Sequence, residues 1–103
     1  MLSFEEYRDR KLSDPAFAEE YERLALSSAI AAAVIRLRIE RDLTQAELAK
    51  LVGTRQSAIS RVESGRHMPS LAFIARIGHA LGAEVEIGFN EKEQSENLVQ
   101  TKA

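Results

Sequence analysis

The chain has no cysteine and no long apolar run. Without cysteine it has no disulfide bond, no thiol chemistry and no thiolate metal site, which favours the reducing cytoplasm as its location. The longest apolar run, residues 29–35, is far shorter than the roughly 20 residues that span a bilayer. The N-terminus lacks the apolar core of a signal peptide. At 103 residues, we expect one soluble globular domain.

Catalytic patterns are also lacking. His67 falls in an expected loop and His79 in the last expected helix, and neither has a further ligand or nucleophile at a meaningful spacing. Paired acids such as Glu19 and Glu20 lie on an amphipathic helix and indicate a solvated face. The sequence contains no glycine-rich phosphate loop. We therefore expect no enzymatic activity, no metal and no cofactor.

The charge of the chain is unevenly distributed. Residues 1–27 carry a net charge of −3, residues 28–82 carry +4 and residues 83–103 carry −3, which together give the net charge of −2. A basic middle between acidic ends predicts an anionic partner for the middle, and a different partner or plain solvent for the ends.

The first part of the chain predicts helices. Phe4 and Tyr7 fit a short amphipathic turn, and after it Asp14 is a good N-cap with Pro15 at the first helical position. A helix is expected from about 15 to 26, with Phe17, Tyr21 and Leu24 as its apolar stripe. The next helix, about 28 to 42, is apolar on two sides. We expect it to lie between the helix before it and the domain after it. Its two stripes are Ile30, Val34 and Leu37, and Ile35 and Ile39.

Three further helices are expected. Thr44 and Glu47 form a capping box for the first of them, which ends at Gly53. Thr54 is expected to cap the second, and Ser70 the third. The second and third are expected to end at Gly65 and Gly82, and small Ala49 allows the first two to cross closely.

A strand pattern follows the last expected helix. Val85, Ile87 and Phe89 alternate with Glu84 and Glu86. Because no second strand is expected in the chain, we infer that this one pairs in trans, with its own copy in a dimer or with a partner's sheet edge. The polar tail after it is expected to be disordered.

The segment at residues 54–65 has an unusual polar face. Ala58, Ile59 and Val62 lie on one side of the expected helix. The opposite side carries mostly short hydrogen-bonding groups rather than the glutamates and lysines of an ordinary solvated face. These residues are Gln56, Ser57, Ser60, Arg61 and Ser64. Gln and Arg side chains can form paired hydrogen bonds to adenine and guanine edges, and small serines permit close approach.

Residues 43–82 resemble the Xre/Cro-type helix-turn-helix domains of phage repressors. The resemblance lies in T-Q-x-E-L-A, then G-x-x-Q-S-x-I-S-x-x-E-x-G, then P-S-L. It implies an all-α, five-helix, lambda-repressor-like domain, here with an N-terminal helical extension and one C-terminal strand pairing in trans. It also implies that the second helix of the motif enters the major groove of DNA.

The resemblance also assigns roles to individual residues. It implies base contacts by Gln56, Ser57, Ser60 and Arg61. It implies phosphate contacts by Gln45, Thr54, Arg55, Ser64 and Arg66. A helix-turn-helix unit that serves only in packing or protein contact is the alternative.

Residues 14–89 more loosely resemble HigA-type antitoxins of type II toxin–antitoxin modules, with the run D-P-x-F-x-x-x-Y near the start. The resemblance implies a RelE/HigB-like ribonuclease toxin as partner and repression of the chain's own operon. The candidate toxin contacts are Phe4, Tyr7, Phe17, Tyr21 and Leu24, whose acidic rim would complement a basic toxin. Alternatively, Phe17 and Tyr21 only cover the second stripe of the next helix.

We accordingly divide the chain into a helical extension at 1–27, a DNA-binding domain at 28–82, a strand at 83–90 and a tail at 91–103. The leading hypothesis is a homodimeric antitoxin and autorepressor on a palindromic operator. A stand-alone Xre-type repressor and a protein-interaction module without DNA binding remain open.

Overall fold

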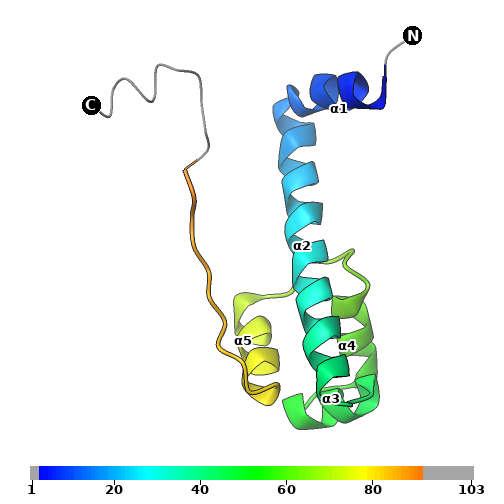
Figure 1. The fold of residues 1–103 in the computed structure, drawn as a ribbon, viewed down its shortest axis with the longest axis vertical. Helices are drawn as coiled ribbons and strands as arrows, with labels where there is room; N and C mark the ends of the chain where they lie inside the picture. Colours follow the sequence, from blue (N-terminus) through cyan, green and yellow to red (C-terminus); the bar gives the residue numbers. More distant parts are fainter. Residues whose placement is uncertain (1–2, 92–103) are drawn as a thin grey trace.

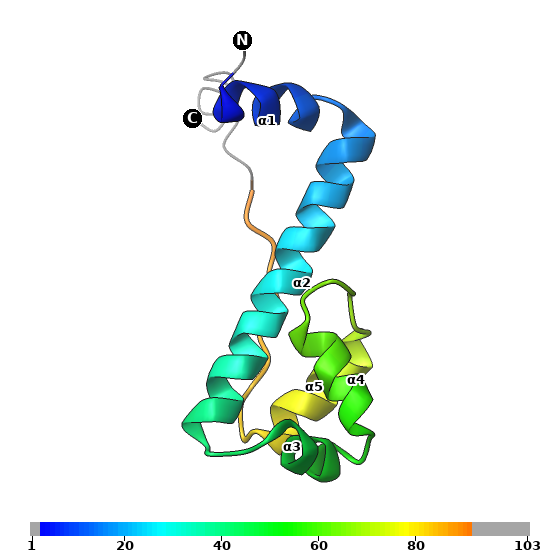
Figure 2. The same ribbon diagram turned by 90° about the vertical axis from the view of Figure 1, so that its right-hand side faces the viewer.

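The computed structural model describes residues 3–91, and this part of the chain is helical, with five helices and no strand. The helices are α1 (Phe4–Leu12), α2 (Pro15–Glu40), α3 (Gln45–Val52), α4 (Gln56–Glu63) and α5 (Leu71–Ala80). α3, α4 and α5 gather around the C-terminal half of α2, and α1 lies across its N-terminal end (Figures 1 and 2). The described residues are thus all helical with five helices, as the fold class predicts, and α3 to α5 with half of α2 form the compact part.

One continuous helix replaces the two expected at 15–26 and 28–42. Between Pro15 and Glu40 the sequence has no further proline and no glycine, and residues 29–33 are mostly alanine, a strong helix former. The three expected apolar stripes therefore lie on one continuous helix, and Phe17 and Tyr21 cannot fold back over Ile35 and Ile39. The expected packing between two separate helices was wrong.

Local chemistry sets most helix starts as expected. The Asp14 carboxylate accepts a hydrogen bond from Ala16 N at 3.0 Å, and the Ser70 hydroxyl accepts one from Phe73 N at 3.1 Å. Thr44 and Glu47 form the expected capping box, with N···O distances of 2.8 and 3.0 Å. α1 has a second box, between Ser3 and Glu6, that we did not expect.

Thr54 does not cap α4, contrary to expectation. The N-cap is Arg55, whose side chain makes no capping hydrogen bond. Gly53 takes the left-handed conformation at the end of α3, with φ 82°, and Thr54 N then donates to Ala49 O at 2.9 Å. This backbone pattern closes α3, so Thr54 belongs to the end of one helix and not to the start of the next.

The core lies between the C-terminal half of α2 and helices α3 to α5. Leu48 and Ile59 are completely buried, and Ala49 is buried where α3 packs on α4. The core residues are Val34, Leu48, Ala49, Val52, Ile59, Val62, Ile77 and Leu81. Only Ser27, Ala31 and Val34 of α2 are buried. The N-terminal half of α2 therefore projects from the compact part.

The expected strand at 83–90 is not formed in the single chain. A strand requires a neighbouring strand for its backbone hydrogen bonds, and residues 3–91 contain no other. The segment runs from α5 back toward the N-terminal end of α2 (Figures 1 and 2). Val85 lies so close to α5 that a Cβ added at Gly78 would be 2.5 Å from its Cγ2. Ile87 and Phe89 are exposed. Residues 92–103 of the expected tail lie outside the described residues.

Within residues 3–91, no helix is both long and apolar enough to cross a membrane, and no group of three or more acidic or histidine side chains could hold a metal ion.

Candidate nucleic-acid interface

α4 presents the polar face expected from the sequence. Ile59 and Val62 point into the core. The side chains on the other side, Gln56, Ser57, Ser60 and Arg61, are all exposed. Ala58 is half-buried, in keeping with its place on the apolar side. The four residues assigned to base contacts therefore share one accessible surface.

The C-terminal end of α4 is attached directly to α2. The Ser27 hydroxyl is buried and donates to Gly65 O at 2.7 Å. Gly65 has φ 72°, and a Cβ there would lie 3.4 Å from the Cα of Ser28. A side chain at this position would be strained and crowded, so glycine lets the loop after α4 approach the backbone of α2. This contact fixes one end of the polar face.

A buried carboxylate fixes α4 to α2 and α3. Glu63 accepts hydrogen bonds from Arg38 Nε at 2.7 Å and Nη2 at 3.1 Å, and from Gln45 Nε2 at 2.9 Å. Arg38 Nη1 also donates to Leu43 O at 2.8 Å. The bonds to Glu63 raise the pKa of the Arg38 guanidinium above its usual value, so the guanidinium stays charged.

We did not predict this network from the sequence. The available signal is that Glu63 follows Ile59 by four residues, which places an acid beside the buried face of α4. Such an acid requires a cation or a donor from another element. The network also changes the view of Gln45. Its side chain is half-buried and one amide N–H is already donated to Glu63, although it stands in the first turn of α3 as expected.

Residues around the turn between α3 and α4 form a shallow hollow beside the polar face. Thr54, Arg55, Ser57 and Arg61 line it, together with Gly53 and Ala58. Arg76 reaches from α5 to the other side of the turn and donates to Val52 O at 3.0 Å, at the negative end of α3. Two of the expected phosphate contacts, Thr54 and Arg55, are thus next to two of the expected base contacts.

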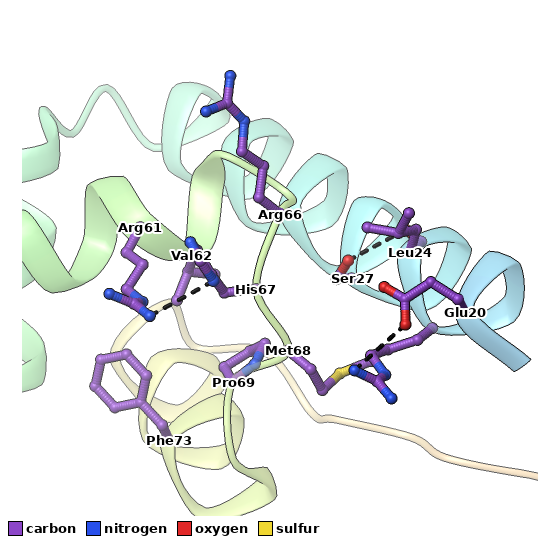
Figure 3. A pocket seen from close by; sticks show the side chains of 11 residues that line it. Glu20, Leu24, Ser27, Arg61, Val62, Arg66, His67, Met68, Pro69 and Phe73 are labelled. Atoms are coloured by element: carbon purple, nitrogen blue, oxygen red, sulfur yellow. Dashed lines mark hydrogen bonds and ion pairs between the residues drawn. The ribbon is translucent and has the colours of Figure 1, made fainter.

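Ser64 and Arg66, the expected phosphate contacts after the end of α4, have different surroundings. The Ser64 hydroxyl donates to Arg61 O at 2.7 Å and accepts from Arg66 N at 3.3 Å, so it stabilises the end of the helix. Arg66 is exposed and extends away from the other labelled side chains (Figure 3). Within residues 3–91, Arg55, Arg61 and Arg66 take part in no salt bridge.

Arg61 also borders a cleft between α2 and the loop after α4. Its Nη2 lies 3.5 Å from Nδ1 of His67, a loop residue to which the sequence gave no role (Figure 3). On the far side of the cleft, Arg23 and Glu20 of α2 form an ion pair at 3.5 Å. Among residues 3–91, no carboxylate therefore pairs with the guanidinium of Arg61, which can turn toward an external acceptor.

The candidate toxin contacts on α1 and α2 are exposed, but they do not gather at the polar face of α4. Phe17 and Tyr21 stack on each other with ring centroids 6.4 Å apart. Phe4 and Tyr7 lie on α1, beyond the N-terminal end of α2 (Figure 1). Leu24 lines the same cleft as Arg61, whereas the four aromatic side chains do not line it.

A helix-turn-helix family model matches residues 34–87, which is just over half of the chain. An "uncharacterized HTH-type transcriptional regulator" of Methanothermobacter thermautotrophicus is 49% identical over 47 residues, covering 46% of this chain and 68% of that protein. The multiprotein-bridging factors 1b and 1a of Arabidopsis thaliana are 34% and 30% identical over 53 residues. These cover 52% of this chain but only 37% of each relative. No solved structure matches the chain significantly.

Proposed function

The chain belongs to the helix-turn-helix family, and on that premise we propose that it is a sequence-specific DNA-binding regulator of transcription that reads its operator with α4. The observation that carries the proposal is the exposed polar face of α4, supported from behind by the core and by Glu63. Short polar side chains on a rigid helix suit the major groove, where each base pair presents its own pattern of donors and acceptors.

The proposed roles follow from the position of each side chain. Arg61 and Gln56 would read a guanine and an adenine through paired hydrogen bonds, while Ser57 and Ser60 allow the backbone of α4 close to the bases. Thr54, Arg55, Ser64 and Arg66 border this face and would contact phosphates, which fix register and affinity. Gln45 would have to contact a phosphate with the amide atoms that Glu63 leaves available.

Arg61 and Arg66 provide the test of this division of roles. An operator is first selected from random duplexes, and binding to it and to a scrambled duplex is measured by fluorescence anisotropy over a range of salt concentrations. Arg61→Ala should cost about 1–3 kcal/mol on the operator and relax specificity at one base pair. Arg66→Ala should weaken both duplexes alike and reduce the salt slope by about one.

Arg8→Ala, on the distant α1, is the matched control and should leave both duplexes unaffected (Figure 1). Equal losses on operator and scrambled DNA for Arg61→Ala would contradict a base contact. No measurable binding to any duplex by the wild-type chain would favour a protein-interaction module.

A palindromic operator requires two copies of the chain, so a homodimer is part of the proposal. One candidate contact is the segment with Val85, Ile87 and Phe89, which would form a strand by pairing with a second copy or with a partner's sheet edge. The exposure of Ile87 and Phe89, at 65% and 100%, supports a contact there.

A second candidate function is that of an antitoxin, in which the extension masks a RelE/HigB-like ribonuclease. The exposed aromatic side chains Phe4, Tyr7 and Tyr21 on an acidic extension favour it, because they suit a basic partner. Co-expression of the chain with tagged proteins from neighbouring genes tests it. A small basic protein that stays bound through a salt wash supports the antitoxin, whereas its absence leaves a stand-alone repressor.

A further inference from the structure

An apolar stripe follows one face of α2 almost from end to end. At about 100° per residue its members lie within about 80° of the helix circumference, and they extend over about 33 Å. They are Phe17, Tyr21, Leu24, Ser28, Ala32, Ile35 and Ile39. All are exposed except Ile35, which is half-buried. We call these seven residues the α2 stripe.

The α2 stripe is centred away from the face that packs on the compact part of the same chain, although Ser28 lies beside Gly65 and Leu24 borders the cleft next to the loop after α4. That face carries Ser27, Ala31 and Val34, which lie about 90° around the helix from the middle of the stripe. Ile39 is 58% exposed although it stands in the half of α2 that touches α4. A row of exposed apolar side chains this long indicates a surface that is covered by another molecule.

The spacing of the stripe is symmetric about Ser28. Successive members are 4, 3, 4, 4, 3 and 4 residues apart, which reads the same in both directions. A two-fold axis through Ser28, perpendicular to α2, therefore places Phe17 of one copy opposite Ile39 of the other. It likewise places Tyr21 opposite Ile35 and Leu24 opposite the small Ala32. Self-complementary spacing of this kind is what an interface between two identical helices requires.

The sizes of the side chains agree with this arrangement. Ser28 is at the centre, and the small Ala32 lies four residues from it, so two helix backbones can approach closely there. The large side chains lie toward the two ends of the stripe. Alternating spacings of three and four residues are those of helices that pack at a small crossing angle.

The charges of α2 favour the antiparallel orientation. The N-terminal half carries Glu19, Glu20 and Glu22 against one arginine, Arg23. The C-terminal half and its cap carry Arg36 and Arg41 against Glu40, besides Arg38, whose charge Glu63 of the same chain already pairs. Antiparallel pairing puts the acidic half of one helix beside the basic half of the other, whereas parallel pairing puts like charges together.

From the spacing, the central small residues and the charges, we infer that α2 pairs antiparallel with α2 of a second copy of this chain, with the two-fold axis at Ser28. The inference concerns the chain without DNA, so it stands or falls separately from operator binding. On this inference, the partner of the projecting half of α2 is the C-terminal half of α2 in the second copy.

The absence of cysteine permits a direct test. A disulfide requires two Cα atoms about 4.4–6.8 Å apart. In an antiparallel pair of helices, a residue and its own copy in the partner come this close only next to the two-fold axis. Full-length Ser28→Cys should form a covalent dimer under mild oxidation at low micromolar concentration. The neighbouring Ala29→Cys, which points about 100° away, is the matched control and should form no covalent dimer.

A second measurement uses two leucines of the same helix. Leu24 belongs to the stripe and is 45% exposed, whereas Leu26 points to the other side and is 59% exposed. In sedimentation equilibrium without DNA, Leu24→Asp should weaken dimerisation at least tenfold and Leu26→Asp should not change it. Circular dichroism of both variants verifies that the helices remain folded, as expected for surface positions.

Three outcomes would overturn the inference. The first is a wild-type chain that is monomeric at high micromolar concentration, which would leave the stripe to a different protein. The second is a dimer that survives Leu24→Asp but dissociates on Ile87→Ser and Phe89→Ser, which would assign the contact to the C-terminal segment. The third is equal oxidation of Ser28→Cys and Ala29→Cys, which would indicate random collision.

Discussion

The two halves of α2 share one continuous helix but differ in their surroundings. The C-terminal half packs against α4 and contributes Ala31 and Val34 to the buried residues of the chain. The N-terminal half is exposed along its length, apart from the half-buried Ala18 and the buried Ser27 at its end. An isolated helix of a dozen residues is marginally stable in water, so the N-terminal half depends on the helix being continued into the compact part.

The comparison separates two tasks within one element. The packed half supports α4 through Ser27, at the junction of the halves, and through Arg38, and so it positions the polar face that we propose to read DNA. Before Ser27, the projecting half makes no such contact with α4 and instead displays apolar side chains. In this molecule the same helix supports the polar face of α4 with one half and displays exposed apolar side chains on the other.

The largest expected difference between the halves concerns truncation of apolar side chains. Ile59→Ala, in the core beneath the polar face, should lower the free energy of unfolding by about 2–5 kcal/mol, because it removes a completely buried side chain. Leu26→Ala, in the projecting half, should change it by less than about 0.5 kcal/mol. Urea unfolding followed by circular dichroism measures both. Similar losses would show that the projecting half is packed as tightly as the core.

A smaller difference is expected between two glutamates that pair with arginines of α2. Glu63→Gln leaves the guanidinium of Arg38 without its charge partner in a site where only 5% of the Glu63 side chain is exposed. We expect a loss of about 2–3 kcal/mol. Glu40→Gln, in the exposed pair with Arg36, should cost less than about 0.5 kcal/mol. The same urea experiment compares them, and a loss for Glu40→Gln as large as for Glu63→Gln would refute the role of burial.

The sequence predicted the parts of the fold that depend on neighbouring residues. Asp14, Thr44 and Ser70 begin helices because their side chains accept hydrogen bonds from amides two or three residues ahead, which is a local property. The polar face of α4 follows equally from the period of its apolar residues. Thr54 was misplaced by one residue, because the backbone bonds that end α3 already use it.

The rest could not be predicted because it depends on residues far apart in the chain. Arg38 and Glu63 are 25 residues apart, and only the packing of α2 on α4 brings them together. The length of α2 was missed for a different reason. A further apolar stripe that begins after residue 27 suggested a break. It marks where the compact part begins to cover the helix, and no residue there ends it.

The smallest expected difference concerns how acid affects the two capping boxes. Ser3 and Glu6 form one at the start of α1, and Thr44 and Glu47 form the other at the start of α3 in the compact part. Hydrogen bonds from the Ser3 backbone and side chain lower the pKa of Glu6, and those from Thr44 lower the pKa of Glu47. A carboxyl whose pKa is lowered in the folded state contributes stability above its ordinary value, about 4.3, and loses it as the pH falls through the lowered value. Both boxes therefore weaken in acid.

The two boxes should weaken with different consequences for the whole chain. Glutamine preserves the box but does not titrate. Glu47→Gln should therefore flatten the acid dependence of the urea midpoint, because α3 belongs to the core. Glu6→Gln should leave that dependence unchanged and alter only amide exchange within α1. If Glu6→Gln also flattened the midpoint, α1 would unfold together with the core, and the projecting region would have to be stabilised by contacts beyond those of a single chain.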